Sequence, residues 1–177
     1  QVKEFLKKFK IIINRMNKIK LVISSLIFCN LISCIENNSI RIDKDILNGW
    51  DIEESIKFEI KDTIDFPSNI FFYIRNNNDY PFSNIFLIAS LKSNQNIYEI
   101  DTLEYMMANN KGEWLGKGFS GVKESKLLWK RSWKSNLSPP YFFEIKQANR
   151  KIGQNKGDKK LFGILSFGLS IEKTSNE

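Results

Sequence analysis

Histidine is absent from this 177-residue chain, and cysteine occurs only as Cys29 and Cys34. Without histidine there is no Ser-His-Asp or Cys-His catalytic site and no imidazole general base for chemistry near neutral pH. Zinc sites of the histidine and cysteine type are excluded for the same reason. The glycines within 112–121 match neither a phosphate-binding loop nor a dinucleotide fingerprint, and they are expected to form turns. We therefore expect no cofactor, no metal and no small-molecule substrate.

An apolar run long enough to span a bilayer is also missing. The apolar segment Leu21–Leu31 is interrupted by polar residues and is shorter than the roughly 20 residues that a spanning helix needs. Two lysines precede it, and Leu-Ile-Ser-Cys follows at 31–34, which is the pattern of a bacterial lipoprotein signal. The pattern predicts cleavage between Ser33 and Cys34. The thiol of Cys34 would then carry a diacylglyceryl group and its amine a further acyl chain such as palmitate.

This interpretation assigns residues 16–33 to the signal peptide. Residues 1–15 precede Met16, a natural start, and are expected to be a non-native upstream extension. The alternative is that the apolar segment forms a buried amphipathic helix of a cytosolic protein.

The basic excess of the chain lies mainly in this leader. Residues 1–33 contain seven of the 27 Lys and Arg residues and one of the 20 acidic residues. The rest of the chain therefore has 20 basic and 19 acidic residues. A strongly basic domain is typical of nucleic-acid binding, but this near balance removes the argument for a nucleic-acid partner. Residues 34–110 carry 6 basic and 13 acidic side chains, and residues 111–177 carry 14 and 6. The molecule is electrically bipolar if these two stretches segregate in space.

The chain from Cys34 onward is long enough for one hydrophobic core and predicts a single domain. Residues 34–49 are polar without sustained periodicity and are expected to be a tether, with the folded domain over 50–177. There, apolar residues recur at every second position between Asn, Gly and Pro turns, which predicts strands. The expected strands are 50–60, 69–75, 85–91, 97–107, 126–130, 141–148 and 165–172. This pattern indicates the all-β class and a single antiparallel β-sandwich or jelly roll.

Two acidic residues form the first candidate site. Glu99 and Asp101 share one face of an expected strand, with roughly 7 Å between their Cα atoms, a spacing over which glycosidase carboxylates cooperate. A solvated strand face is the favoured interpretation, because nothing else in the sequence identifies a sugar-cleaving site.

Aromatic and basic residues form the second candidate site, a surface patch for a glycan, a lipid headgroup or a protein. Its residues are Trp129, Arg131, Trp133 and Lys134. Packing of the alternate rings into the core is the favoured alternative.

Beyond the lipobox at Cys34, a series of short segments covers nearly all of the remaining chain. The segments are Arg75-Asn76 with 80–84, 101–104, 112–118, 141–150 and 168–173. Their order and spacing resemble the GldH family of gliding-motility lipoproteins from the Bacteroidetes. The resemblance implies a non-catalytic lipoprotein, associated with the outer membrane and needed for gliding alongside the type IX secretion machinery. Its partners would be the membrane, through the lipid anchor, and other gliding and secretion proteins of the envelope.

Three hypotheses follow for the function. The leading one is an accessory lipoprotein of the gliding and secretion apparatus. The second is a lipid-anchored module that binds envelope glycans, and the third is a glycan-cleaving enzyme that uses Glu99 and Asp101. The sequence leaves open whether the domain faces the periplasm or the outside.

Overall fold

The structure is a computed structural model that describes residues 39–93, 96–150 and 157–174. The predictions for residues 1–38, among them the signal peptide, the cleavage site at Ser33 and the acylation of Cys34, lie outside the described residues. Within the described ranges, no helix is long and apolar enough to cross a membrane.

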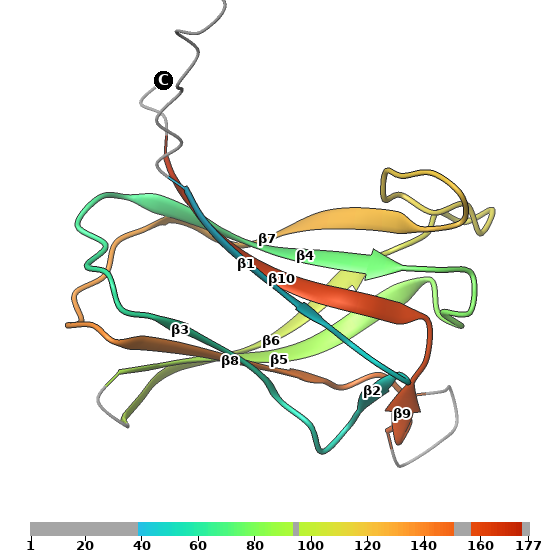
Figure 1. The fold of residues 1–177 in the computed structure, drawn as a ribbon, viewed down its shortest axis with the longest axis horizontal. Coiled ribbons are helices and arrows are strands. Elements are labelled where there is room, and N and C mark those ends of the chain that lie inside the picture. Colours follow the sequence, from blue (N-terminus) through green and yellow to red (C-terminus); the bar gives the residue numbers. More distant parts are fainter. Residues whose placement is uncertain (1–38, 94–95, 151–156, 175–177) are drawn as a thin grey trace, which may run out of the picture. The chain divides into compact units, whose positions relative to one another are not determined.

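Antiparallel strands build the described part of the chain. The first sheet has the order β1-β10-β4-β7 and the second sheet has the order β3-β8-β5-β6, while β2 pairs with β9 alone. The two large sheets form the upper and lower layers of Figure 1. The prediction of an all-β sandwich is thereby confirmed. The bounds in chain order are β1 Ser39–Asp45, β2 Trp50–Asp51, β3 Ile56–Ile60, β4 Ser68–Asn76, β5 Asn84–Ser93, β6 Asn96–Met106, β7 Lys123–Trp133, β8 Tyr141–Gln147, β9 Lys160–Leu161 and β10 Ile164–Lys173.

Aromatic rings from both sheets fill the space between the layers. Phe72 of β4 stacks on Trp129 of β7 with 5.1 Å between ring centroids and lies 5.2 Å from Phe167 of β10. Phe143 of the second sheet meets Trp129 edge to face at 6.0 Å. Each fully buried ring contributes about 2–3 kcal/mol through the apolar area that it removes from water. This cluster is the main contact that holds the two sheets together.

The first strand corrects the predicted tether over residues 34–49. Residues 39–45 form β1, which pairs with β10 at all seven positions from Ser39 to Asp45. Ile40 and Ile42 pack against the core, and the remaining side chains face solvent because β1 is an edge strand. Two apolar positions are too few to give a sustained period, so the pattern of this strand resembles that of a polar linker.

The strand expected over residues 50–60 is also corrected, because a turn interrupts it. Trp50 belongs to β2 and pairs with Leu161 of β9, and the chain turns before β3 begins at Ile56. The indole Nε1 of Trp50 donates to the carbonyl oxygen of Glu54 at 3.0 Å and closes this turn. Apolar residues on both sides of the turn are buried, which gave the false appearance of a continuous alternation.

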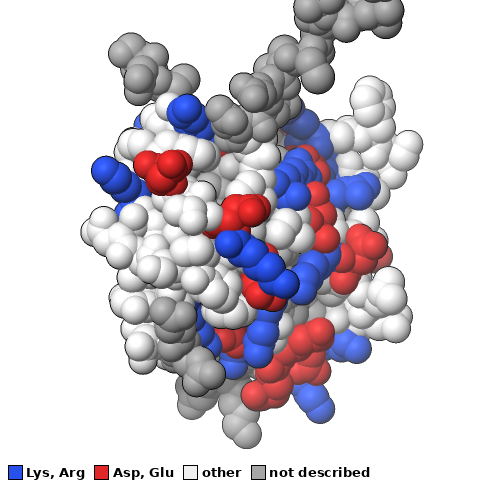
Figure 2. All heavy atoms as spheres, turned by 60° about the vertical axis from the view of Figure 1, so that its left-hand side comes forward, with Lys and Arg blue, Asp and Glu red and all other residues white. Residues whose placement is uncertain are grey.

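The acidic and basic stretches of the sequence interleave in space. Ion pairs join residues 34–110 to residues 111–177 in several places, such as Arg41 with Glu124 and Lys92 with Glu144. Figure 2 shows the two kinds of side chain interspersed over one face of the molecule. Among the described residues, the acidic and basic stretches therefore do not segregate in space, which an electrically bipolar molecule would require.

Glu144 is the most strongly stabilised carboxylate of the second sheet. Ser55 donates its hydroxyl to Glu144 at 2.6 Å, and Lys92 forms an ion pair with it. The hydrogen bond from Lys92, followed by that from Ser55, lowers the pKa of Glu144 to about 2. A carboxylate whose pKa is lowered by folding adds stability above its unfolded pKa and loses it as the pH falls through the folded value.

We predict that Glu144→Gln lowers the free energy of unfolding by about 1–2 kcal/mol at pH 7. The difference from the unsubstituted protein shrinks as the pH falls from 4.5 toward 2. Urea unfolding at a series of pH values measures it. Glu59→Gln, at a more exposed carboxylate of β3, is the control and should change stability by less than about 0.5 kcal/mol. A destabilisation by Glu144→Gln that stays constant down to pH 2 would contradict the prediction.

Candidate functional site

β6 is an edge strand of the second sheet and β7 is an edge strand of the first. Their side chains meet along one side of the sandwich. We call this cluster the β6–β7 rim, and it consists of Glu99, Asp101, Tyr105, Trp129 and Lys130.

Hydrogen bonds and ion pairs connect the two strands of the rim. Trp129 donates Nε1–H to Asp101 at 2.8 Å, and Tyr105 donates its hydroxyl to the carbonyl of Leu128 at 2.8 Å. The ammonium of Lys130 lies 2.5 Å from Asp101 and also pairs with Glu99. The rim thus holds two carboxylates around one ammonium.

A β-bulge in β7 places these side chains. Phe71 pairs with Leu128, but Ile70 pairs with Lys130, so Trp129 is an extra residue in the ladder. Without the bulge, Lys130 would continue the outward row of Lys126 and Leu128. The bulge instead puts it opposite the buried Ile70 and directs it toward β6.

The charge state of the rim follows from these contacts. Partial burial is the largest single effect on Asp101 and raises its pKa, but the hydrogen bonds from Lys130 and Trp129 together outweigh it and leave the pKa lowered. Burial lowers the pKa of Lys130, and its bonds to Asp101 and Glu99 raise the pKa overall. Burial, followed by the charge of Asp101, raises the pKa of Tyr105 to about 12. Asp101 is therefore ionised at neutral pH, whereas a glycosidase general acid needs a raised pKa.

The structure replaces the favoured interpretation of Glu99 and Asp101 as a solvated strand face. The two residues do share a face of β6, as expected, but that face is turned toward β7 and is ion-paired. Their role is to close the sandwich at this side. The bulge that brings Lys130 to them has no signal in the sequence that we can identify.

The second candidate site separates into core and surface. Trp129 is only 8% exposed, and Trp133 packs edge to face on Tyr141 and Phe143 at 6.1 and 6.4 Å. Arg131 and Lys134 are exposed. The two rings thus pack in or against the core, whereas the two basic side chains lie on the surface.

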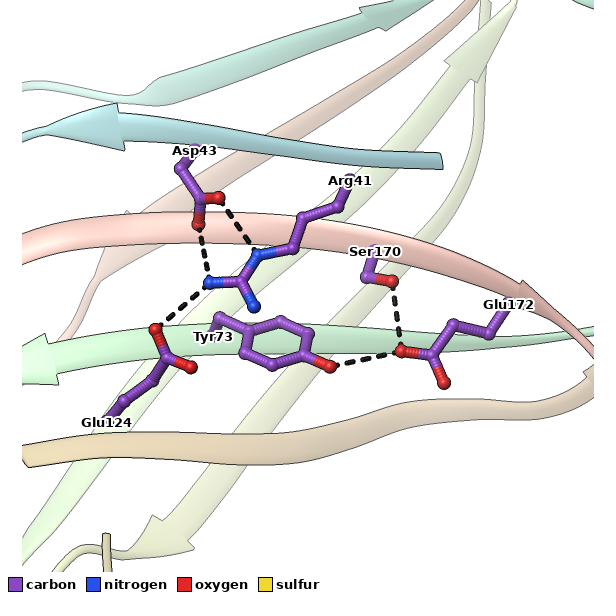
Figure 3. Close-up of polar contacts among 6 residues, drawn as sticks. All are labelled: Arg41, Asp43, Tyr73, Glu124, Ser170 and Glu172. Carbon is purple, nitrogen blue, oxygen red and sulfur yellow. Dashed lines mark hydrogen bonds and ion pairs between the residues drawn. The ribbon is translucent and has the colours of Figure 1, made fainter. Parts of the chain in front are cut away.

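A further polar network, which sequence reasoning missed, crosses the outer face of the first sheet (Figure 3). The guanidinium of Arg41 on β1 pairs with Asp43 at 2.9 Å and with Glu124 on β7 at 3.0 Å, and it lies 3.8 Å from the ring centroid of Tyr73 on β4. The hydrogen bond to Asp43 is the main reason that the pKa of Arg41 is raised. We call the six residues labelled in Figure 3 the Arg41 network, which ties the edge strand β1 to the opposite edge of its sheet.

Gly168 of β10 makes room for the Arg41 network. It lies between Asp43 and Tyr73 in the strand register, and a Cβ at this position would lie 2.1 Å from Oδ1 of Asp43. The glycine therefore allows side chains of β1 to lie across β10. No signal for the network was available, because β1 itself was not predicted.

A cleft of about 470 Å³ lies beside β1 and β3, lined by residues 44–47, Trp50 and 54–57. The indole N–H of Trp50 is already used by Glu54, and charges of both signs line the cleft. Among the described residues there is no group of three or more acidic, histidine or cysteine side chains that could hold a metal ion.

Residues 40–171 match the GldH lipoprotein family. The chain belongs to this family. A gliding motility lipoprotein GldH homolog of Christiangramia forsetii is 41% identical over 148 residues, which cover 82% of this chain and 91% of the relative. A gliding motility lipoprotein GldH of Flavobacterium johnsoniae is 36% identical over 145 residues, which cover 81% and 89%. No solved structure matches the chain.

The family match confirms the resemblance seen in the sequence. It begins at residue 40, inside β1, which agrees with the place of β1 in the sandwich. The β6–β7 rim and most of the Arg41 network also lie within the matched residues.

We predict that Lys130→Met lowers the free energy of unfolding by about 1–2 kcal/mol at pH 7, because two neighbouring carboxylates lose their cation. The loss should shrink as the pH falls below about 4, the ordinary pKa of an aspartate, because protonation of Asp101 removes its attraction to Lys130. Chemical denaturation at pH 7 and pH 3 measures it. Arg131→Met is the matched control and should cost less than about 0.5 kcal/mol. Equal losses for the two variants would contradict the role of the rim.

Proposed function

We propose that this chain is a non-catalytic lipoprotein that functions in gliding motility, is anchored to the outer membrane through acylated Cys34, and is an accessory to the gliding and type IX secretion machinery. The observation that carries the proposal is the membership of the GldH family, with relatives named gliding motility lipoprotein over more than 80% of this chain. The signal-like sequence at residues 16–34 supports the anchor.

The position of β1 limits how far the domain can lie from the membrane. With cleavage before Cys34, only residues 35–38 separate the acylated residue from Ser39, where β1 begins. Such a segment spans at most roughly 17 Å when fully extended. Several acyl chains on one residue give stable attachment. The sandwich would therefore act close to the membrane surface, and its partners must be reachable there.

The non-catalytic part of the proposal is supported by the chemistry of the rim. Glu99 and Asp101 are paired with Lys130, and neither has the environment of a general acid. The alternative of a glycan-binding module depended on exposed tryptophans, but all four tryptophans are buried or half-buried. No observation in the described residues favours this alternative.

Replacement of Cys34 tests the anchor. Cys34→Ala should abolish acylation and the cleavage before residue 34, lower the amount of protein in the outer-membrane fraction and abolish gliding, because the domain loses its lipid attachment. Mass spectrometry of the mature N-terminus, membrane fractionation and colony spreading are the three measurements. Cys29→Ala, within the predicted signal peptide, is the control and should leave all three unchanged. Normal gliding by cells whose Cys34→Ala protein is unacylated would contradict the proposal.

A longer linker tests whether the domain acts near the membrane. Insertion of about 20 Gly and Ser residues between Asn38 and Ser39 gives an average reach of roughly 25 Å on its own. We predict normal acylation and folding but reduced gliding, measured by colony spreading. A four-residue insertion is the control and should have little effect. Full gliding with the long linker would show that the short connection has no role.

A further inference from the structure

The edge of β6 differs from the other strand edges of the two large sheets. β3 has five residues, β7 carries a bulge and several charged side chains, and β1 carries the charges of the Arg41 network. β6 has eleven residues, and among the described strands it pairs only with β5, with a single register irregularity near its start. Long, regular and unpaired edges are templates for another strand. β6 therefore offers the longest regular edge of the four.

Exposed apolar side chains lie on the outward face of β6, which also carries Thr102 and Glu104. Tyr98, Ile100 and Met106 are 50%, 58% and 52% exposed, and Ile88 of the neighbouring β5 is also exposed. These residues lie on the outer face of the second sheet, because Leu87 and Ala89 on either side of Ile88 are buried in the core. An apolar strip beside an unpaired edge is a feature of interaction sites.

The opposite face of β6 is acidic. Glu99 and Asp101 share only one described cation, Lys130, so the rim carries one carboxylate more than it has ammonium groups. Both carboxylates are partly exposed at the edge. Side chains that lie directly opposite on adjacent strands are about 5 Å apart, so a strand added to β6 would place every second residue beside these acids.

We propose that the edge of β6 binds an extended segment of a partner protein by strand addition, and that this segment alternates apolar residues with Lys or Arg. Its apolar side chains would extend the strip of Tyr98, Ile100 and Ile88. Its basic side chains would lie beside Glu99 and Asp101 and supply the missing positive charge. The backbone provides affinity, and the alternate side chains provide specificity.

A second copy of this chain fits the same edge less well. In the antiparallel register that pairs the full length of two β6 strands, Asp101 lies opposite Asp101 of the other copy. A register shifted by two residues, in which the N-terminal parts of the two strands overlap, puts Asp101 of each copy opposite Glu99 of the other. Like charges directly opposite each other are destabilising. The acids on the inner face thus disfavour self-association and favour a basic partner.

Binding of short designed peptides tests the proposal independently of the proposed role in gliding. The protein is the full acylated chain in nanodiscs of zwitterionic lipid. The probes are three fluorescent peptides of about nine residues: alternating Val and Lys, alternating Val and Glu, and the Val and Lys composition with all lysines grouped. Fluorescence anisotropy should show that the alternating Val-Lys peptide binds about tenfold or more tightly than the other two.

Backbone methylation of that peptide tests strand addition directly. Methyl groups on every second amide nitrogen block one edge of the peptide, and methyl groups on the remaining amides block the other edge. Only the set on the edge that faces β6 should abolish binding, because the amides of alternate residues point to opposite edges of a strand. Equal effects of the two sets would overturn the proposal.

Variants of the protein locate the site. Glu99→Gln should weaken binding of the Val-Lys peptide about fivefold, since a charge-assisted contact becomes neutral. Ile100→Lys should weaken it more than tenfold. Glu59→Gln is the matched control, because its side chain on β3 is 45% exposed compared with 39% for Glu99, and it should have no effect. Thermal unfolding verifies that each variant is folded.

Three results would overturn the proposal. They are equal binding of all three peptides, equal binding of the Val-Lys peptide to empty nanodiscs, and equal weakening by Glu99→Gln and Glu59→Gln. A concentration-dependent dimer in ultracentrifugation that Ile100→Lys disrupts, without peptide binding, would assign the edge to a second copy instead.

Discussion

The bulge at Trp129 in β7 determines how the two sheets close on each other. Trp129 lies on the inward side of β7 with Ser125 and Leu127 and stacks on Phe72, and the extra residue turns the next side chain, Lys130, toward β6. One local irregularity therefore places the ion pairs at the side of the sandwich directly beside the central aromatic stack. Without it, Lys130 would face outward and Glu99 and Asp101 would repel each other without compensation. The buried rings and the charged rim thus lie side by side on β7.

The rim also explains why β6 can be both well ordered and open. Its inner face is fixed to β7 by Asp101 and Tyr105, and one of its backbone edges is paired with β5. The other backbone edge has no partner strand among the described residues. β1 lies at the opposite end of the first sheet from β7. The strand that leads toward the proposed lipid anchor and the edge proposed to bind a partner are thus on opposite sides of the sandwich.

The sequence predicted the parts of this fold that depend on apolar alternation. β4, β5 and β8 were found nearly to the residue, since Phe72, Leu87 and Phe143 mark the inward positions of long regular strands. β1 was missed because an edge strand buries only one face and needs only Ile40 and Ile42 for it. The prediction of one strand over residues 50–60 was wrong, because a turn joins two buried segments while buried residues remain at even-numbered positions on both sides.

The candidate sites were harder to predict than the strands. Sequence reasoning placed Glu99 and Asp101 correctly on one face but could not identify what lay opposite, because Lys130 reaches them only through a bulge in a strand of the other sheet. A single inserted residue changes which side chains share a face, and composition does not reveal it.

The pairing of β1 with β10 has a mechanical consequence if Cys34 is the anchor. Any force between the membrane and the domain enters the sandwich at Ser39, the first residue of an edge strand. A pull along the axis of β1 loads all seven residue pairs in shear, whereas a pull across the axis would peel them apart one after another. The Arg41 network links β1 directly to β4 and β7, so detachment of β1 must break these contacts as well as the ladder with β10.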